Sequence, residues 1–143
     1  MRARGPISSL ALLAALPAIA CQPQAAPVDR SQSPVGVEWT LVELDGQPSA
    51  PGAGGRSPTL LLAAEGSRIS GFAGCNRMMG SYELDGDSIR FTAIGTSKMA
   101  CDAGMDVEKR YAAALGTVSG YRVAGGRLEL LRDTTVVARL EAR

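Results

Sequence analysis

Two cysteines, Cys75 and Cys101, are the residues of this 143-residue chain with the most obvious chemistry. Cysteines in exported proteins commonly form disulfides, and the N-terminus of this chain has the pattern of an export signal. We therefore predict that the fold brings Cys75 and Cys101 together in a disulfide, which closes a loop of about 27 residues. Two buried free thiols, packed as small apolar groups, are the alternative.

Thiol redox catalysis is the main enzymatic alternative for the same pair. Enzymes of this kind need a thiolate of low pKa, generally in a Cys-x-x-Cys motif at a helix N-terminus. Cys101 does precede the one predicted helix, but Cys75 is distant and no Cys-x-x-Cys motif is present. The chain also has no histidine, which is the commonest general base and metal ligand. We therefore expect a protein that is not an enzyme and holds no cofactor or metal.

Other residue types with potential chemistry have structural explanations. Asp85 and Asp87 flank a glycine in a predicted turn, and Asp102 and Asp106 fall at the predicted start of a helix. Thioethers can bind Cu(I), but filling the core is the favoured role of the four methionines of the domain, Met78, Met79, Met99 and Met105.

The first residues predict export. In residues 1–20, Arg2 and Arg4 precede an apolar run that is too short to span a membrane and ends in small residues, as in a signal peptide. The sequence Ala18-Ile19-Ala20-Cys21 resembles the lipobox of bacterial lipoproteins. We predict that Cys21 is lipidated and anchors the protein to the periplasmic side of a membrane, which leaves an even pair of cysteines. Cleavage by ordinary signal peptidase, giving a soluble periplasmic or secreted protein, is the alternative.

A linker and one domain follow the signal. Residues 21–35 are small, polar and proline-rich, and they predict a flexible, lipid-anchored linker before a domain over residues 36–143. Without the first twenty residues, the side-chain net charge is −1. No basic run accompanies aromatic positions, so we expect no nucleic-acid partner.

Short alternating segments predict a mainly β domain. Seventeen glycines and eight prolines favour turns, and alternation marks strands in the segments 37–44, 59–63, 68–73, 81–84, 88–91, 121–124, 127–131 and 136–141. Trp39 and Leu41 share one face of the first strand while Val42 and Leu44 share the other, which indicates a bulge or a strand that is buried on both sides at its end. Tyr82 and Leu84 share one face of their strand, and Ile89 and Phe91 face inward from the next. We predict eight or nine short antiparallel strands in a small β-barrel-like or strongly curved sheet.

Only one segment has helical periodicity. Its apolar stripe predicts a helix late in the chain, with Asp102 as N-cap and with Asp106 and Glu108 favoured near its positive end. The helix would lie across one opening of the sheet. The stripe consists of Val107, Tyr111, Ala114, Leu115 and Val118.

Several motifs, taken in order, resemble one known family. The string Ser70-Gly71-x-x-Gly74-Cys75-Asn76, followed by Met99-Ala100-Cys101, is the most specific part. With Trp39-Thr40-Leu41, Glu108 and the closing Leu128-x-Leu130, it is similar to the META domain, the family that includes the heat-shock protein HslJ. The resemblance covers residues 36–143. It implies structural roles for Gly71, Gly74, Asn76 and Met99, and the two cysteine positions of the family carry over to Cys75 and Cys101.

The resemblance implies a mainly β domain with one helix, often exported and carried on lipoproteins. It also implies an association with the stress response and the cell envelope, without an established enzymatic activity. We therefore expect a binding or stabilising module of the envelope with an unidentified envelope protein as partner. One alternative is a barrel that encloses a small apolar ligand. Another is an inhibitor that inserts the loop 46–58 into a partner; a mobile surface linker is the simpler reading of that loop.

Overall fold

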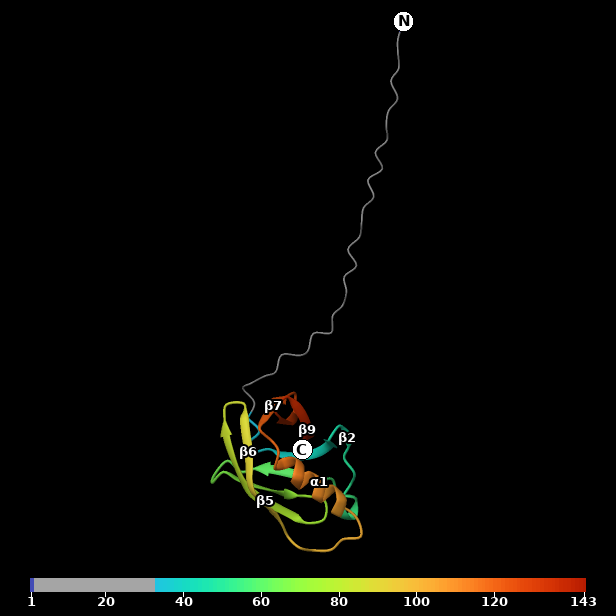
Figure 1. Ribbon diagram of the computed structural model, residues 1–143, viewed down its shortest axis with the longest axis vertical. Helices are drawn as coiled ribbons and strands as arrows, with labels where there is room; N and C mark the ends of the chain where they lie inside the picture. The colour runs from blue at the N-terminus through green and yellow to red at the C-terminus, as the bar shows by residue number, and fades with distance from the viewer. Residues whose placement is uncertain (2–32) are drawn as a thin grey trace.

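The computed structural model describes Met1 and residues 33–143 (Figure 1). Apart from Met1, the predicted signal peptide lies outside the described residues, as do the predicted lipidation site Cys21 and most of the predicted linker. The last residues of that linker already belong to the domain. Val35 forms a β-bridge with Leu62, and the Trp39 indole Nε1 donates to the carbonyl of Pro34 at 2.8 Å. The folded unit therefore begins slightly before the predicted boundary at residue 36.

Nine strands and one α-helix make up the regular structure of residues 33–143, as the alternation predicted. The helix α1 spans Met105–Leu115, and a short 3-10 turn spans Ala53–Gly55. The strands are β1 (Glu38–Leu44), β2 (Gln47–Pro48), β3 (Thr59–Leu62), β4 (Arg68–Phe72), β5 (Arg77–Asp85), β6 (Ser88–Thr96), β7 (Gly120–Ala124), β8 (Arg127–Arg132) and β9 (Thr135–Ala142).

The strands form one antiparallel sheet that closes on itself. From β3 to β9 each strand pairs with the next in sequence, and β1 pairs with both β3 and β9, which completes a ring. The short β2 pairs with the end of β1. The weakest seam lies between β6 and β7, where only Ser88 and Gly120 are paired. A mainly β fold with a strongly curved sheet and one late helix is thus confirmed.

The interior is filled by large apolar side chains. The predicted helix stripe from Val107 to Val118 is buried, and Tyr111 is fully buried against the sheet. Figure 1 shows α1 lying across the ring of strands. The largest side chains that are at most 2% exposed are Trp39, Tyr111, Leu41, Leu44, Leu60, Leu62, Ile69, Met78, Ile89, Leu115, Leu128 and Leu130.

The bulge predicted in β1 is confirmed. It lies between Leu41 and Glu43, turns Leu44 inward again and leaves Val42 exposed. Leu84 is 39% exposed because it lies near the tip of the β5–β6 hairpin, beyond the core. The predicted N-cap is wrong, because Gly104 and not Asp102 holds that position of α1, at φ 93°, and no side chain caps the helix.

The loop 46–58 is a packed element of the domain. The Ala53 N–H donates to the carbonyl oxygen of Gly74 at 2.7 Å, and the Gly52 N–H donates to the carbonyl of Arg56 at 2.7 Å. Gly52 and Pro58 are buried. The prediction of a mobile surface linker is therefore wrong, because one hydrogen bond and the buried Gly52 hold this loop against the turn at Gly74, while the second hydrogen bond closes the loop on itself.

A ladder of alternating charges, the charge ladder, crosses the outer face of four strands. Glu43 of β1, Arg139 of β9, Glu129 of β8 and Arg122 of β7 are paired in succession. Arg139 Nε lies 3.0 Å from Glu129, and Arg122 lies 3.1 Å from the same carboxylate. These are cross-strand pairs of opposite charge, as expected on the solvent face of a sheet.

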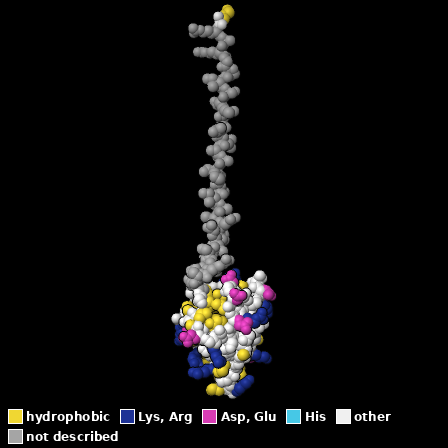
Figure 2. Space-filling view, turned by 90° about the vertical axis from the view of Figure 1, so that its left-hand side faces the viewer, with side chains coloured by type: hydrophobic (Ala, Val, Ile, Leu, Met, Phe, Trp, Pro, Cys, Tyr) yellow, Lys and Arg dark blue, Asp and Glu magenta, His cyan; other side chains and the backbone are white. Residues whose placement is uncertain are grey.

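Charged side chains are not evenly spread on the face shown in Figure 2. Acidic side chains lie mostly over the upper half of the domain, while lysine and arginine side chains predominate toward its lower end. No helix in the described part of the chain combines the length and the apolar character needed to cross a lipid bilayer.

Candidate functional site

The strands β4 and β5 are joined by a tight turn, residues 73–76, which we call the corner. Gly74 has φ 140°, and a Cβ there would lie 2.6 Å from both the Gly104 carbonyl oxygen and Val107 Cγ1. Gly71 is close to another strand, since a Cβ there would overlap the carbonyl oxygen of Thr59. Both predicted motif glycines therefore allow backbones to approach closely, which any side chain would prevent.

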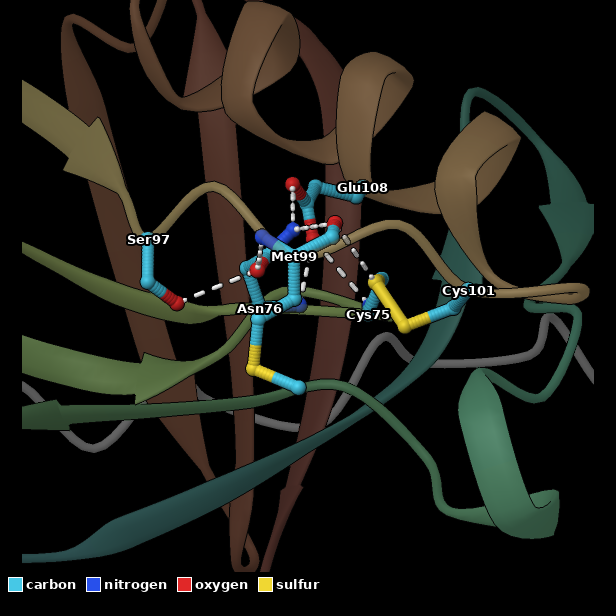
Figure 3. The surroundings of a disulfide bond; sticks show 6 residues. All are labelled: Cys75, Asn76, Ser97, Met99, Cys101 and Glu108. Carbon is cyan, nitrogen blue, oxygen red and sulfur yellow. Dashed lines mark hydrogen bonds between the residues drawn. A yellow bond between two sulfur atoms is a disulfide. The ribbon is translucent and has the colours of Figure 1, made fainter.

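A disulfide closes the corner against the segment that follows β6. Cys75 and Cys101 are bonded, with their Cα atoms 5.9 Å apart and a sequence separation of 26. Cys75 is 7% exposed. Its sulfur lies 3.3 Å from the carbonyl oxygen of Met99, a contact without hydrogen bonding because a disulfide sulfur carries no proton (Figure 3).

Asn76 connects the corner to the same segment through its side-chain amide. Its Oδ1 accepts from the Met99 N–H at 2.7 Å and from the Ser97 hydroxyl at 3.1 Å. Its Nδ2 donates to the Met99 carbonyl at 3.1 Å and to Glu108 at 2.9 Å. Asn76 is 2% exposed, so the side chain has all four of its hydrogen-bonding positions filled without water (Figure 3). It pairs with the Met99 peptide as a neighbouring strand would.

Glu108 is the central acceptor of this cluster, and sequence reasoning missed that role. From the first turn of α1 its carboxylate accepts from the Cys75 N–H at 3.1 Å and from the Asn76 N–H at 2.6 Å, besides Asn76 Nδ2. The side chain is 7% exposed. In the sequence, the helix dipole already explains why Glu108 lies in the first turn of the helix, so no further role was sought for it. The spacing of 32 residues from Asn76 carries no local signal that could have revealed the contact.

The surroundings of Glu108 favour its charged form. Burial acts to raise its pKa, but hydrogen bonds from the Asn76 side chain and from the backbone N–H groups of Asn76 and Cys75 outweigh burial, and the pKa is lowered. A buried carboxylate with several donors is a stable anion. Glu108 therefore serves here as a fixed negative charge that holds the corner to the helix.

The prediction that the four methionines fill the core is wrong for three of them. Met78 is buried, whereas Met79 and Met105 are 58% and 45% exposed and Met99 is 65% exposed. Only Met78 therefore fills the core. Met99 joins the cluster through its backbone and leaves its side chain in solvent beside the disulfide.

Chemically, this cluster holds a structure together. The two sulfurs are bonded to each other, and the polar atoms of Asn76 and Glu108 are engaged within the protein. In residues 33–143, no group of three or more acidic, cysteine or histidine side chains is arranged to hold a metal ion. Of the predicted residues, the structure brings together Cys75, Cys101, Gly74, Asn76 and Met99, with Gly71 nearby at the end of β4. Cys21 lies outside the described residues.

Comparison with known proteins finds one matching family and two similar structures. The sequence model of the META domain family matches residues 32–143. A search of curated proteins found no match. An NMR structure of a protein from Burkholderia xenovorans is similar, with 28% identity and a TM-score of 0.63 over 77% of this chain and 83% of that one. A second NMR structure, 17% identical with a TM-score of 0.57 over 73% of this chain and 87% of the other, shares the fold.

Proposed function

The chain belongs to the META domain family, and on that premise we propose that it is a non-enzymatic, HslJ-like lipoprotein of the cell envelope, which binds or stabilises other envelope components under stress. The observation that carries the proposal is the closed corner. A disulfide and a buried, fully hydrogen-bonded Asn76–Glu108 pair join three distant segments of the chain. Structural disulfides belong to oxidising compartments, and a locked scaffold suits a protein that must stay folded under stress.

The proposal of a non-enzymatic role is supported by the partners of the reactive groups. Glu108 is ionised and surrounded by donors, so it is a poor general acid or base. Cys75 is buried and bonded to Cys101, so a redox cycle would have to open the corner. Insulin reduction by the purified protein above background would contradict this part of the proposal.

Cell fractionation and stress survival test the function directly. A strain that lacks the gene would be complemented with the wild-type chain or with Cys21→Ser, and survival after heat shock would be measured. We expect the wild type in the membrane fraction with full survival, and Cys21→Ser in the soluble fraction with reduced survival. Unchanged membrane retention of Cys21→Ser would contradict the lipid anchor. Equal survival of the deletion strain and the wild type would contradict the role under stress.

Two of the alternative functions have observations against them, while one observation favours a binding role for the loop 46–58. The interior of the sheet is filled by Trp39, Tyr111 and leucines, which argues against an enclosed apolar ligand. The loop is held at Gly74 by Ala53, so it is not free to insert into a partner as an inhibitor would. It does present the exposed Arg56 beside the corner, where that side chain lines two hollows in the surface.

A further inference from the structure

Two neighbouring hollows lie in the surface beside the corner. The first, which we call the corner hollow, has a volume of about 330 Å³ and includes Arg56, Phe72, Arg77, Ser97 and Met99 in its lining. The second has a volume of about 340 Å³ and shares Arg56 and Phe72 with the first. Volumes of this size are at the lower end of those that hold small ligands. The two hollows are therefore adjoining parts of one surface depression.

The corner hollow carries positive charge that the described part of the protein does not neutralise. Two arginines and no carboxylate are among its lining residues. None of the ion pairs found within residues 33–143 uses Arg56 or Arg77, whereas Arg122 and Arg139 are both paired in the charge ladder. A guanidinium is a planar donor group that matches the geometry of carboxylate and phosphate. The chemistry of this lining therefore suits an oxyanion.

The same hollow also offers apolar surface. The Arg56 guanidinium carbon lies 3.9 Å from the centre of the Phe72 ring, which places a cation over an aromatic face. Met99 is 65% exposed, and its side chain lies outside the hydrogen-bonded cluster that holds its backbone. An exposed methionine adapts readily to an apolar partner. A ligand with an apolar body could therefore lie on Phe72 and Met99 while its charged group meets the arginines.

We propose that the corner hollow binds an oxyanion carried on an apolar body. Arg56 and Arg77 hold the phosphate or carboxylate, and Phe72 and Met99 contact the apolar part. An anionic lipid and a soluble organic anion share this chemistry. The inference rests on the proposed function, because it names the ligand class of a binding module. The competing explanation is that Arg56 only covers the Phe72 ring and that the hollow is not a binding site. In that case, replacing Arg77 would not change the affinity for the ligand.

Calorimetric titration of the purified full-length protein tests the ligand class. The probes are hexyl phosphate, inorganic phosphate and hexyltrimethylammonium. We expect hexyl phosphate to bind about tenfold more tightly than inorganic phosphate, because a partly buried alkyl chain adds apolar contact. Hexyltrimethylammonium should not bind. Absence of hexyl phosphate binding, or equal binding of the cationic probe, would overturn the proposal.

Single arginine variants test the site. Arg77→Met and Arg56→Met should each weaken hexyl phosphate binding by about tenfold, the size expected for loss of a hydrogen bond to a charged group. Arg132→Met is the matched control, since Arg132 is an exposed arginine that lines neither hollow, and it should bind within about twofold of the wild type. Wild-type affinity in Arg77→Met would refute the site. Because Arg77 is exposed at the start of β5, its variant is expected to fold even if Arg56→Met does not.

Vesicles identify the source of the anion. Cys21→Ser protein would be sedimented with vesicles of phosphatidylglycerol or of phosphatidylcholine. Binding to phosphatidylglycerol alone, lost in Arg77→Met, assigns the site to an anionic lipid headgroup. Binding of hexyl phosphate without sedimentation assigns it to a soluble anion. If hexyl phosphate does not bind while the wild-type gene still restores survival, this inference fails and the proposed envelope function stands.

Discussion

The corner and the charge ladder are both polar clusters that join distant strands, but their surroundings differ. At the corner, Glu108 and Asn76 are 7% and 2% exposed, and the donors to the carboxylate are backbone and amide N–H groups. In the ladder, the side chains of Arg139 and Glu43 are 34% and 28% exposed. Water can replace the partners of a ladder residue but not those of a corner residue. We therefore expect a contact at the corner to contribute much more to the free energy of unfolding than a contact in the ladder.

The largest expected effect is that of Asn76→Ala. The substitution leaves both polar groups of the partly buried Met99 peptide without their partner and removes one donor from the buried Glu108 carboxylate. We expect the free energy of unfolding to fall by about 4 kcal/mol, measured by urea denaturation. Ser97→Ala, which removes one donor to the same amide, should lower it by about 1 kcal/mol or less. Equal losses in the two variants would contradict the role given to Asn76.

Loss of the disulfide should have the next largest effect. The double variant Cys75→Ala with Cys101→Ala frees a loop of about 27 residues, and the free energy of unfolding should fall by about 3.5 kcal/mol in the chain-entropy description. Reductant should destabilise the wild type by a similar amount and leave the double variant unchanged. Stability of the wild type that does not depend on reductant would show that the bond is absent or without effect.

Glu108→Gln tests the charge of the corner through its pH dependence. The folded pKa of Glu108 lies below its ordinary value of 4.5, so ionised Glu108 contributes stability above pH 4.5 that is lost as the pH falls through the folded pKa. We expect the variant to be about 2 kcal/mol less stable at pH 7. The difference should shrink on acidification below pH 4.5. Asp106→Asn, an exposed neighbour in the same helical turn, is the control and should keep the wild-type acid dependence.

The smallest expected effect belongs to the ladder. Arg139→Met removes two ion pairs, with Glu43 and Glu129, yet should lower the free energy of unfolding by less than about 1 kcal/mol. Because the pairs are partly exposed, the loss should decrease further in 1 M salt. A loss as large as that of Asn76→Ala would remove the distinction between the two regions.

Much of this architecture could be predicted because it depends on local patterns. Period-two alternation, glycine turns and one helical stripe lead to a mainly β domain with a late helix, and these patterns are independent of distant contacts. Pattern reasoning failed where tertiary contacts decide the outcome. Leu84 alternates with Tyr82 as expected but is exposed near the tip of a hairpin, and Asp102 does not cap α1. The sequence of the loop 46–58 has no periodicity, so it gave no sign that Gly52 packs against Gly74 and that Ala53 donates to the Gly74 carbonyl.

The candidate site was predicted only in part for the same reason. The glycines and cysteines of the corner are visible in the sequence because their residue types are unusual there. The role of Glu108 as acceptor for the corner was not recognised, because an acidic residue in a first helical turn needs no further explanation and its partners are more than 30 residues away. The pairing of Cys75 with Cys101 follows from composition and compartment, while the hollow beside them depends on Arg56, Phe72 and Arg77 from three separate segments.

Native-state hydrogen exchange at the Asn76 amide tests the central claim, that the corner is locked to the helix, most directly. This N–H donates to the buried Glu108 carboxylate at 2.6 Å. It should exchange only through global unfolding, with the same protection as the N–H groups of the core strand residues Leu128 and Leu130. Exchange at the rate of an exposed loop, with the disulfide intact, would show that the corner opens independently and would contradict the account.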